Sequence, residues 1–574
     1  METLVRSKTR WMFSVIAAFG LILAACGGDD TSSKGANGKP LPADQQVLRV
    51  RMPGEPGTID PQLAAGATEA SIAKQIGAGL FTYDSDLKVV NNLAKEMPTV
   101  ANGGVSADGM TYKIELAEDA KWSDGKAVTP ADFVYGIQRA LDPTVASPYA
   151  PFFYGIVGAI DYNTALGTPD EPKSASPAQL QELRSKVGVS AEGNKVVYRL
   201  VEPTPSFLNL LSLWTAFPAR QDVIEKYGAS WTEPETIVSS GPFVLKSWEH
   251  DQKMTFEPNP YWAGEKPTLS RLEVNIITDD SVAYDAYLNG ELDMVALPAS
   301  AMREATTSGS SISSQVVETP DLTTVALFMN NTSAPFDNAL VRQAFGTAID
   351  RNAYVQGVLQ GAGKTATAWL PPGMPGYDAK LGGQYEFDAS KAKELLAKGG
   401  YPNGDGLPAI NFIMVNSDAN RVAGQFLQNQ FKMNLGVDVT FEYLEGKDFG
   451  PRFVRGNYQA SIQRWQADWP YPDNWLPAQF TTGSPNNVSR YTNPKFDQLM
   501  GEAAKLTDDA KRLDKYSEAE KLMLDDAALV PLYNMVSYTL VKPNVQGLYL
   551  TGLDGALKGD WSFTHAFLTD GSGQ

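Results

Sequence analysis

Apolar and polar residues alternate over short stretches of the chain, which is the pattern of β-strands that bury one face. Residues 47–52 alternate in this way, and residues 109–116 do so after an Asp-Gly turn. Further strands are predicted over residues 195–200, 243–248, 253–257, 272–277, 323–329, 410–415, 437–443 and 537–541.

Other stretches repeat apolar residues every three or four positions, as an amphipathic helix does. A helix is predicted over residues 131–141. Thr129 can cap this helix, Pro130 suits its first position and Asp132 complements its dipole. Further helices are predicted over residues 281–288, 338–349, 390–397, 419–435 and 508–525. Strands and helices interleave without strict βαβ alternation, which predicts a multi-domain α/β protein with mixed sheets.

Composition narrows the function classes. The 574 residues are too many for one hydrophobic core, so two or three domains are expected. Hydrophobic residues make up 43% of the chain and aromatic residues 10%, which fits a folded body. The formal net charge of −18 argues against a nucleic-acid partner and mildly favours cationic ligands.

Residues for metal binding or nucleophilic catalysis are scarce. The chain has two histidines, His250 and His565, far apart in sequence, and one cysteine. Neither a metal ion nor a cofactor is therefore predicted, and both histidines are interpreted as structural or surface groups. A carboxylate pair of the glycosidase type stays open, because 66 acidic residues offer many pairs and none stands out.

The first residues have the layout of a secretory signal peptide, predicted over residues 1–25. Arg6, Lys8 and Arg10 supply positive charge ahead of a short apolar stretch. The Leu-Ala-Ala-Cys sequence that ends at Cys26 resembles a bacterial lipobox. This resemblance implies that the Cys26 thiol is acylated and that cleavage makes Cys26 the first residue. An uncleaved anchor helix, or a secreted protein with an incidental cysteine, is the alternative.

Residues 26–44 are predicted to be a flexible tether, because small and polar residues dominate them without apolar periodicity. Two or more acyl chains hold a protein firmly at a membrane, whereas one holds it weakly. The predicted location is therefore the outer face of the cytoplasmic membrane, with the lipid as the anchor.

A series of short segments, in the same order, resembles the peptide-binding branch of extracellular solute-binding protein family 5, which serves ABC importers. The resemblance runs from about residue 47 to the end of the chain. Its segments are Gly57-Thr-Ile-Asp-Pro61, residues 120–133, residues 141–150, residues 239–245, Asn259-Pro-Tyr-Trp262, Gly290-Glu-Leu-Asp293, residues 331–336, residues 341–345, residues 391–401, Trp465-Gln-Ala-Asp-Trp469 and Val541-Lys-Pro543.

The resemblance implies an α/β, three-lobed periplasmic-binding-protein-like fold (type II, cluster C) with a hinged ligand cleft between lobes I and III. The expected boundaries are residues 45–84, 217–321 and 537–574 for lobe I, 85–216 for lobe II and 322–536 for lobe III.

It also implies a function. The protein is expected to be a monomer without enzymatic activity that captures oligopeptides by hinge closure and delivers them to an ABC transporter permease. A receptor of the same fold for a sugar, an opine or a metal chelate is the alternative, and an extracellular hydrolase is the third hypothesis.

Asp468 is the sharpest candidate for ligand binding. It stands where peptide-binding members carry the aspartate that pairs with the peptide α-amino group. A carboxylate enclosed by aromatic residues is costly to bury alone, so it selects a ligand cation that neutralises it. An aspartate that caps a turn is the structural alternative.

The resemblance extends to neighbouring positions. Tyr149 falls where the family has a tyrosine near the same amine. Ala67, Arg464 and Gln466 align with positions whose backbones pair with an extended peptide, and Trp465 is expected to wall the site.

The sequence departs from the family pattern elsewhere. Phe328 stands where the best-known members carry an acidic residue, and residues 294–297 are apolar, which suggests apolar side chains in the ligand. Arg452 or Arg455 is a candidate contact for the peptide C-terminus, with an ordinary surface charge as the alternative.

Overall fold

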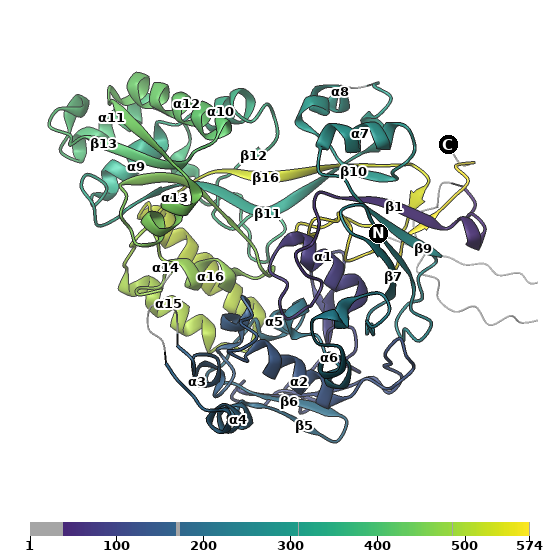
Figure 1. The fold of residues 1–574 in the computed structure, drawn as a ribbon. Coiled ribbons are helices and arrows are strands. Elements are labelled where there is room, and N and C mark those ends of the chain that lie inside the picture. The colour runs from purple at the N-terminus through teal and green to yellow at the C-terminus, as the bar shows by residue number, and fades with distance from the viewer. Residues whose placement is uncertain (1–37, 168–172, 308, 485, 573–574) are drawn as a thin grey trace, which may run out of the picture. The chain divides into compact units, whose positions relative to one another are not determined.

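The computed structural model describes residues 38–167, 173–307, 309–484 and 486–572 (Figure 1). The predicted signal peptide, Cys26 and the first part of the predicted tether lie outside the described residues. Among the described residues, no helix is long and apolar enough to cross a membrane.

One four-stranded sheet contains the first strand of the described chain. Its order is β1 (Val47–Met52), β9 (Arg271–Ile276), β8 (Lys253–Pro258) and β7 (Phe243–Glu249), and β1 runs parallel to β9. The alternation predicted for β1 is confirmed, because Leu48, Val50 and Met52 are buried and the residues between them are half-buried. Phe563 and Leu568, near the end of the chain, pack into the same core.

A second, three-stranded sheet has the order β4 (Thr111–Glu115), β6 (Lys195–Arg199) and β5 (Val189–Glu192). Helix α2 (Pro130–Ala140) accompanies it and begins as predicted, with Pro130 at its first position. The Thr129 backbone N–H donates to the Asp132 carboxylate across 2.8 Å. A separate hairpin pairs β2 (Phe81–Tyr83) with β3 (Val89–Asn91).

The largest sheet is built on two long strands, β11 (Val316–Met329) and β16 (Val530–Val541), which run antiparallel side by side (Figure 1). Its order is β10 (Met294–Ala296), β16, β11, β15 (Ala460–Gln466), β13 (Ile410–Val415) and β14 (Val439–Leu444), and β12 (Lys364–Thr365) pairs with β16. The strand β11 is 14 residues long and β16 is 12. Because β10 pairs with one end of β16 and β15 pairs with the opposite end of β11, the long pair connects these two parts of the sheet.

Both long strands extend beyond the residues that the sequence pattern predicts. Pro320 lies inside β11 and Pro531 inside β16, and each lies beside a register shift of the pair. Proline cannot donate a ladder hydrogen bond, so it interrupts the sequence signal, yet an irregularity in the ladder accommodates it.

The helices predicted from periodicity are present with small shifts at their ends. They are α7 (Asp280–Leu288), α9 (Ala339–Thr347), α11 (Ala389–Lys398), α12 (Asp418–Leu435) and α16 (Asp509–Asp525). The helices without such a prediction are α1 (Ala67–Ile76), α3 (Ala159–Asn163), α4 (Pro177–Lys186), α5 (Phe207–Leu210), α6 (Gln221–Tyr227), α8 (Met302–Thr306), α10 (Arg351–Gly357), α13 (Gly446–Val454), α14 (Leu476–Phe480) and α15 (Pro494–Ala504). The strands without a prediction are β2, β3, β5, β10, β12, β15, β17 (Val545–Gln546) and β18 (Phe567–Leu568).

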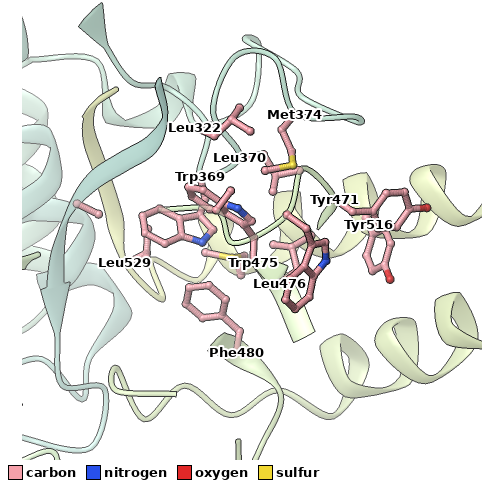
Figure 2. Packing of buried hydrophobic residues seen from close by; sticks show 14 of the residues in the cluster. Leu322, Trp369, Leu370, Met374, Tyr471, Trp475, Leu476, Phe480, Tyr516 and Leu529 are labelled. Carbon is pink, nitrogen blue, oxygen red and sulfur yellow. The ribbon is translucent and has the colours of Figure 1, made fainter. Parts of the chain in front are cut away.

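Two tryptophans hold the segment that follows β15. The Trp369 and Trp475 rings lie 5.1 Å apart, and Phe480 packs against Trp369 (Figure 2). In the same segment, the Tyr471 hydroxyl donates to Asp509 and accepts from Arg512, each across 2.6 Å. The Ala467 N–H also donates to the Leu322 carbonyl of β11 across 2.9 Å, so the chain from Ala467 to Trp475 is fixed on the large sheet and on α16.

The Gly57-Thr-Ile-Asp-Pro61 motif has a structural role. The Arg139 guanidinium of α2 binds both oxygens of Asp60, at 2.8 and 2.5 Å, and the two side chains are 11% and 4% exposed. The Trp231 indole N–H also donates to Asp60, across 3.3 Å. This buried ion pair ties the loop before α1 to α2.

We predict that Asp60→Ala lowers the free energy of unfolding by about 3–5 kcal/mol, because it leaves the Arg139 charge buried without its partner. Thermal unfolding of the purified protein measures the loss. Asp86→Ala is the matched control, since Asp86 and Lys88 pair at 3.3 Å with both side chains more than 70% exposed, and should cost no more than about 1 kcal/mol. Equal midpoints for the two variants would contradict the assignment.

Candidate ligand-binding site

A cavity of about 230 Å³ brings together four of the residues predicted from sequence, Ala67, Tyr149, Gln466 and Asp468. We call it the cleft cavity. Its other lining residues come from α1 and the loop before it, from β2, from the chain around Trp214, from the end of β15 and from the C-terminal segment: Ala65, Gly66, Ala70, Lys74, Tyr83, Leu213, Trp214, Ala467, Leu553, Asp554, Gly555 and Trp561.

Asp468 follows the end of β15, and the Asn474 side chain contacts both its backbone and its carboxylate. Its backbone N–H donates to the Asn474 side-chain oxygen across 3.0 Å, and the Asn474 amide donates to the Asp468 carboxylate across 3.1 Å. Burial raises the pKa of the Asp468 carboxyl, and the Asn474 hydrogen bond lowers it in part. Among the described residues the carboxylate has no salt bridge, so its charge stays uncompensated in the ligand-free protein.

The aromatic residues Tyr83, Tyr149, Trp214 and Trp561 line the same cavity as this carboxylate. The Tyr149 ring lies 4.9 Å from Phe152 and 5.3 Å from Trp214, and Phe152 lies 5.6 Å from Trp469. Burial, followed by the charge of Asp468, raises the pKa of Tyr149 to about 12. The Tyr149 hydroxyl therefore keeps its proton at neutral pH and can donate a hydrogen bond into the cavity.

The wall formed by α1 and the C-terminal segment holds a buried ion pair. Lys74 Nζ lies 2.7 Å from the Asp560 carboxylate, and their side chains are 4% and 0% exposed. The same ammonium lies 4.3 Å from the centre of the Trp561 ring. The Asp560 carboxylate also accepts from the Ser71 hydroxyl across 2.6 Å. The positive charge that lines the cavity is thus neutralised inside the protein.

A second carboxylate, Asp554, also lines the cavity. It accepts from the backbone N–H groups of Thr551 and Gly559, across 3.0 and 2.8 Å. Burial, followed by the charge of Asp560, raises the pKa of Asp554 to about 6. Since Lys74 is neutralised, the cavity walls carry net negative charge at neutral pH, which favours a cationic group in the ligand.

The geometry of strand β15 determines where the side chains of the predicted residues 464–466 point. Successive side chains of a strand point to opposite faces, so Gln466 and Arg464 share one face and Trp465 takes the other. Gln466 lines the cleft cavity, whereas Arg464 is exposed and its guanidinium lies 3.7 Å from Met535 Sδ. Neither Trp465 nor Arg464 is among the residues that line the cavity.

Ala67 is the first residue of α1, so its backbone is helical rather than extended. Its carbonyl accepts from the Ala556 N–H across 3.2 Å. Only its N–H, which belongs to the first turn and has no partner inside the helix, is available to a ligand.

The two arginine candidates lie elsewhere. The Arg452 guanidinium binds both oxygens of Glu442, across 2.7 and 3.0 Å, and Arg455 lines a separate surface cavity beside Arg490. Neither lines the cleft cavity. Phe328 is also absent from its lining, because its ring is buried against Trp369 and Phe453 at 5.8 Å. Phe328 therefore gives no support to the predicted preference for apolar ligand side chains.

Sequence reasoning missed several residues of the cavity, above all Lys74, Trp214, Asp554 and Trp561. Helix α1 is buried along most of its length, including Ser71, Lys74 and Gln75. A helix without a polar face has no amphipathic pattern, so the sequence carried no periodic signal for it. The C-terminal segment carried none either, because it contributes loops to the site.

Residues 88–487 match the description "Bacterial extracellular solute-binding proteins, family 5 Middle". The chain belongs to this family. It is 31% identical over 552 residues to the periplasmic oligopeptide-binding protein OppA of Escherichia coli, covering 94% of this chain and 96% of that one. It is 29% identical over 557 residues to the oligopeptide-binding protein OppA of Bacillus subtilis, covering 95% and 98%.

Not every relative is named for peptides. The probable deoxycholate-binding periplasmic protein YgiS of Escherichia coli is 30% identical over 516 residues, covering 88% of this chain and 91% of that one. Family membership therefore does not determine the chemical class of the ligand, which has to be inferred from the residues of the site.

Solved structures confirm the predicted family fold. The unliganded open form of the periplasmic murein tripeptide binding protein MppA matches with a TM-score of 0.79 and 26% identity, over 92% of this chain and 98% of that one. The Haemophilus influenzae OppA complex with the peptide RPPGFSPFR matches with a TM-score of 0.67 and 26% identity, over 92% and 99%.

We predict that Asp468→Asn raises the thermal midpoint of the ligand-free protein at neutral pH by about 1–4 °C. Burial raises the pKa of this acid in the folded state, so the folded protein binds the proton more tightly than the unfolded chain does. Stability is therefore lost as the pH rises from the ordinary aspartate range, about 3.9, through the raised pKa. Asparagine keeps an acceptor for Asn474 without the charge.

Thermal unfolding of both proteins between pH 4 and 8 checks this, and their difference should shrink toward pH 4. Asp86→Asn is the control for an exposed aspartate and should leave the midpoint unchanged. A wild type that is more stable than Asp468→Asn at pH 7 would show that the carboxylate has an internal partner.

Proposed function

We propose that this protein captures oligopeptides for an ABC importer and that Asp468 binds the α-amino group of the peptide. One observation carries the proposal: a half-buried carboxylate that lines a cavity, and whose pKa is raised by its surroundings, has no salt-bridge partner among the described residues. Burying a charge is costly unless a partner neutralises it, and an ammonium group of the ligand supplies that partner. Tyr149, whose hydroxyl keeps its proton, lines the same cavity and can accept or donate a further hydrogen bond.

The charge of the site separates this proposal from the alternatives. A sugar needs no counter-charge, and an anionic ligand such as deoxycholate would be repelled by Asp468 and by the ionised form of Asp554. An ammonium group gains from both carboxylates. The expected role is binding and release without catalysis.

The strand β15 supports recognition of the peptide backbone. Residues 460–466 pair with β11, while the recorded pairing of β15 with β13 involves Ala460 alone. The end of β15 that leads to Asp468 thus has a free edge among the described strands. A peptide anchored at Asp468 can add to this edge by main-chain hydrogen bonds, which do not depend on its side chains.

The strands β11 and β16 support a hinge. The proposed boundaries of lobe III, at residues 321/322 and 536/537, fall inside these two strands. The ladder between them changes register between Pro320 and Thr324, opposite Val536 and Asn534. Both crossings therefore contain a local irregularity at the same level, where a few residues can absorb the rotation that closes the cleft.

We predict that free-amine tripeptides and tetrapeptides raise the midpoint of thermal unfolding, since a ligand at 100 times its Kd adds about 2.7 kcal/mol. N-acetylated copies of the same peptides should not. Asp468→Asn should weaken free-amine peptides about 30-fold or more, because losing one partner of a buried charge pair costs about 2–5 kcal/mol. Calorimetric titration of residues 38–574 measures the affinities.

Asp86→Asn is the matched control and should bind as the wild type does. In Asp468→Asn, free and acetylated peptides should bind almost equally, because the group that distinguishes them is gone. Acetylated peptides that bind the wild type as tightly as free ones would refute the amine contact but not peptide binding. A sugar or chelate that binds where peptides do not would refute the peptide function.

We further propose that Cys26 carries the lipid that holds the protein at the outer face of the cytoplasmic membrane. The sequence around Cys26 supports this proposal, and the residue itself lies outside the described part of the chain.

Cys26→Ser is expected to abolish incorporation of labelled palmitate, because the serine hydroxyl does not replace the thiol in a lipobox. The variant should move from the membrane fraction to the soluble or culture fraction. Membrane association that persists in Cys26→Ser without label would favour an uncleaved anchor helix instead.

A further inference from the structure

A second cavity, of about 440 Å³, lies next to the cleft cavity. We call it the aromatic cavity. Lys74, Tyr83 and Trp561 line both cavities and thus form the wall between them, and Asp560, the partner of Lys74, lines the aromatic cavity. Further aromatic rings of the aromatic cavity come from Phe81, Phe217, Trp262, Tyr549 and Phe563. Its volume is in the range of sites for small ligands, and nothing in the proposed peptide contacts uses it.

Asp84 is the carboxylate of this cavity that lacks a cation. One of its oxygens accepts from the backbone N–H groups of Asp86 and Lys88, each across 2.9 Å. The Lys88 ammonium pairs with Asp86 instead, at 3.3 Å, and among the described residues Asp84 has no salt bridge. Burial, followed by the charges of Asp84 and Asp554, raises the pKa of Tyr549 to about 12. Asp84 thus acts on the ring that forms part of the cavity wall.

The other charged groups of the aromatic cavity leave its walls negative. Asp560 neutralises Lys74, as described above. Glu265 lies with one oxygen 2.9 Å from His565 Nδ1, and its side chain is 67% exposed. Glu265 is therefore placed at the solvent side, where it can attract a cation, while Asp84 has no compensating charge.

The rings add a second attraction for a cation. The Lys74 ammonium already occupies one face of Trp561 at 4.3 Å, so the aromatic partners left for a ligand cation are the other rings that line the cavity. Trp262 is buried, and its indole N–H donates to the Glu265 carbonyl across 3.0 Å, which fixes this ring beside the cavity. Aromatic faces combined with a free carboxylate match the chemistry of a guanidinium group, which stacks on rings and forms paired hydrogen bonds with a carboxylate.

We propose that the aromatic cavity is a second binding site, specific for a guanidinium group, in which Asp84 is the charged partner and the aromatic walls enclose the cation. The group comes either from an arginine side chain of the captured peptide or from a separate small molecule. The site does not depend on the peptide function, and its test uses a probe that has no free amine.

The probe is N-acetyl-arginine amide, which carries one guanidinium and no other charge, and its neutral control is N-acetyl-citrulline amide. Calorimetric titration of the full chain without its lipid gives the affinity. The arginine probe should bind saturably, and the citrulline probe should bind about tenfold more weakly or not at all, since a hydrogen bond to a charged group is worth about that factor.

Asp84→Asn should weaken the arginine probe to the level of the citrulline probe, while keeping the acceptor for the two backbone N–H groups. Glu265→Gln should weaken it less, because His565 shares that carboxylate. Asp438→Asn, at an exposed aspartate that lines neither cavity, and Asp468→Asn are the controls and should leave the affinity unchanged. The site is refuted if both probes bind equally, if Asp84→Asn binds the arginine probe as the wild type does, or if Asp468→Asn abolishes its binding.

A second set of titrations identifies the source of the group. Free-amine peptides with arginine or citrulline at each position are compared in the wild type and in Asp84→Asn. If the wild type prefers the arginine peptides and Asp84→Asn does not, the guanidinium group in the site comes from a side chain of the captured peptide. If the arginine and citrulline peptides bind equally, and the arginine probe still binds when peptide saturates the protein, the group comes from a separate small molecule.

Discussion

A carboxylate partly removed from water without a cation beside it destabilises the protein that holds it, and Asp468, which is half-buried, is in this position. The surrounding structure maintains this costly arrangement. The Trp369 and Trp475 rings and the Tyr471 hydrogen bonds fix the segment that carries Asp468, and Asn474 orients its carboxylate. The wall opposite is equally fixed, because the buried Lys74–Asp560 pair ties α1 to the C-terminal segment. A ligand that supplies the missing positive charge removes this destabilisation, so the same carboxylate favours binding.

The same electrostatic reasoning connects the two cavities. Lys74 is the lysine of the shared wall, and Asp560 neutralises it, so the carboxylates on either side are not compensated by it. The cleft cavity then presents Asp468 to a cation and the aromatic cavity presents Asp84. The acidic composition of the whole chain is compatible with many functions. These two carboxylates place negative charge at two specific cavities, where a ligand cation can neutralise it.

Two elements that the sequence predicted show the periodic burial on which the prediction rested. The strand β1 alternates buried and half-buried residues, and α2 combines an apolar stripe with the expected Thr129, Pro130 and Asp132 start. The helix α1 and the strand β15 escaped prediction for opposite reasons. Polar Lys74 and Gln75 are buried in α1 because Asp560 satisfies them, while β15 mixes exposed Arg464 and Gln466 with half-buried Trp465.

The candidate site was predictable only where a local motif carried it. Asp468 and Tyr149 were found through segments that resemble a family, and the structure places both in one cavity. Lys74, Asp554 and Trp561 depend on contacts between residues almost 500 positions apart, such as Lys74 with Asp560. No local pattern encodes such a contact, because each partner alone is an ordinary charged or aromatic residue.

The central claim is that the ligand brings the cation that Asp468 lacks, and a crystal structure of the complex with a free-amine tripeptide tests it most directly. The account predicts the ligand ammonium nitrogen at about 2.7–2.9 Å from an Asp468 oxygen, the distance of a charge-assisted hydrogen bond. A complex in which Asp468 contacts only protein atoms, with the ammonium bound elsewhere, would contradict it.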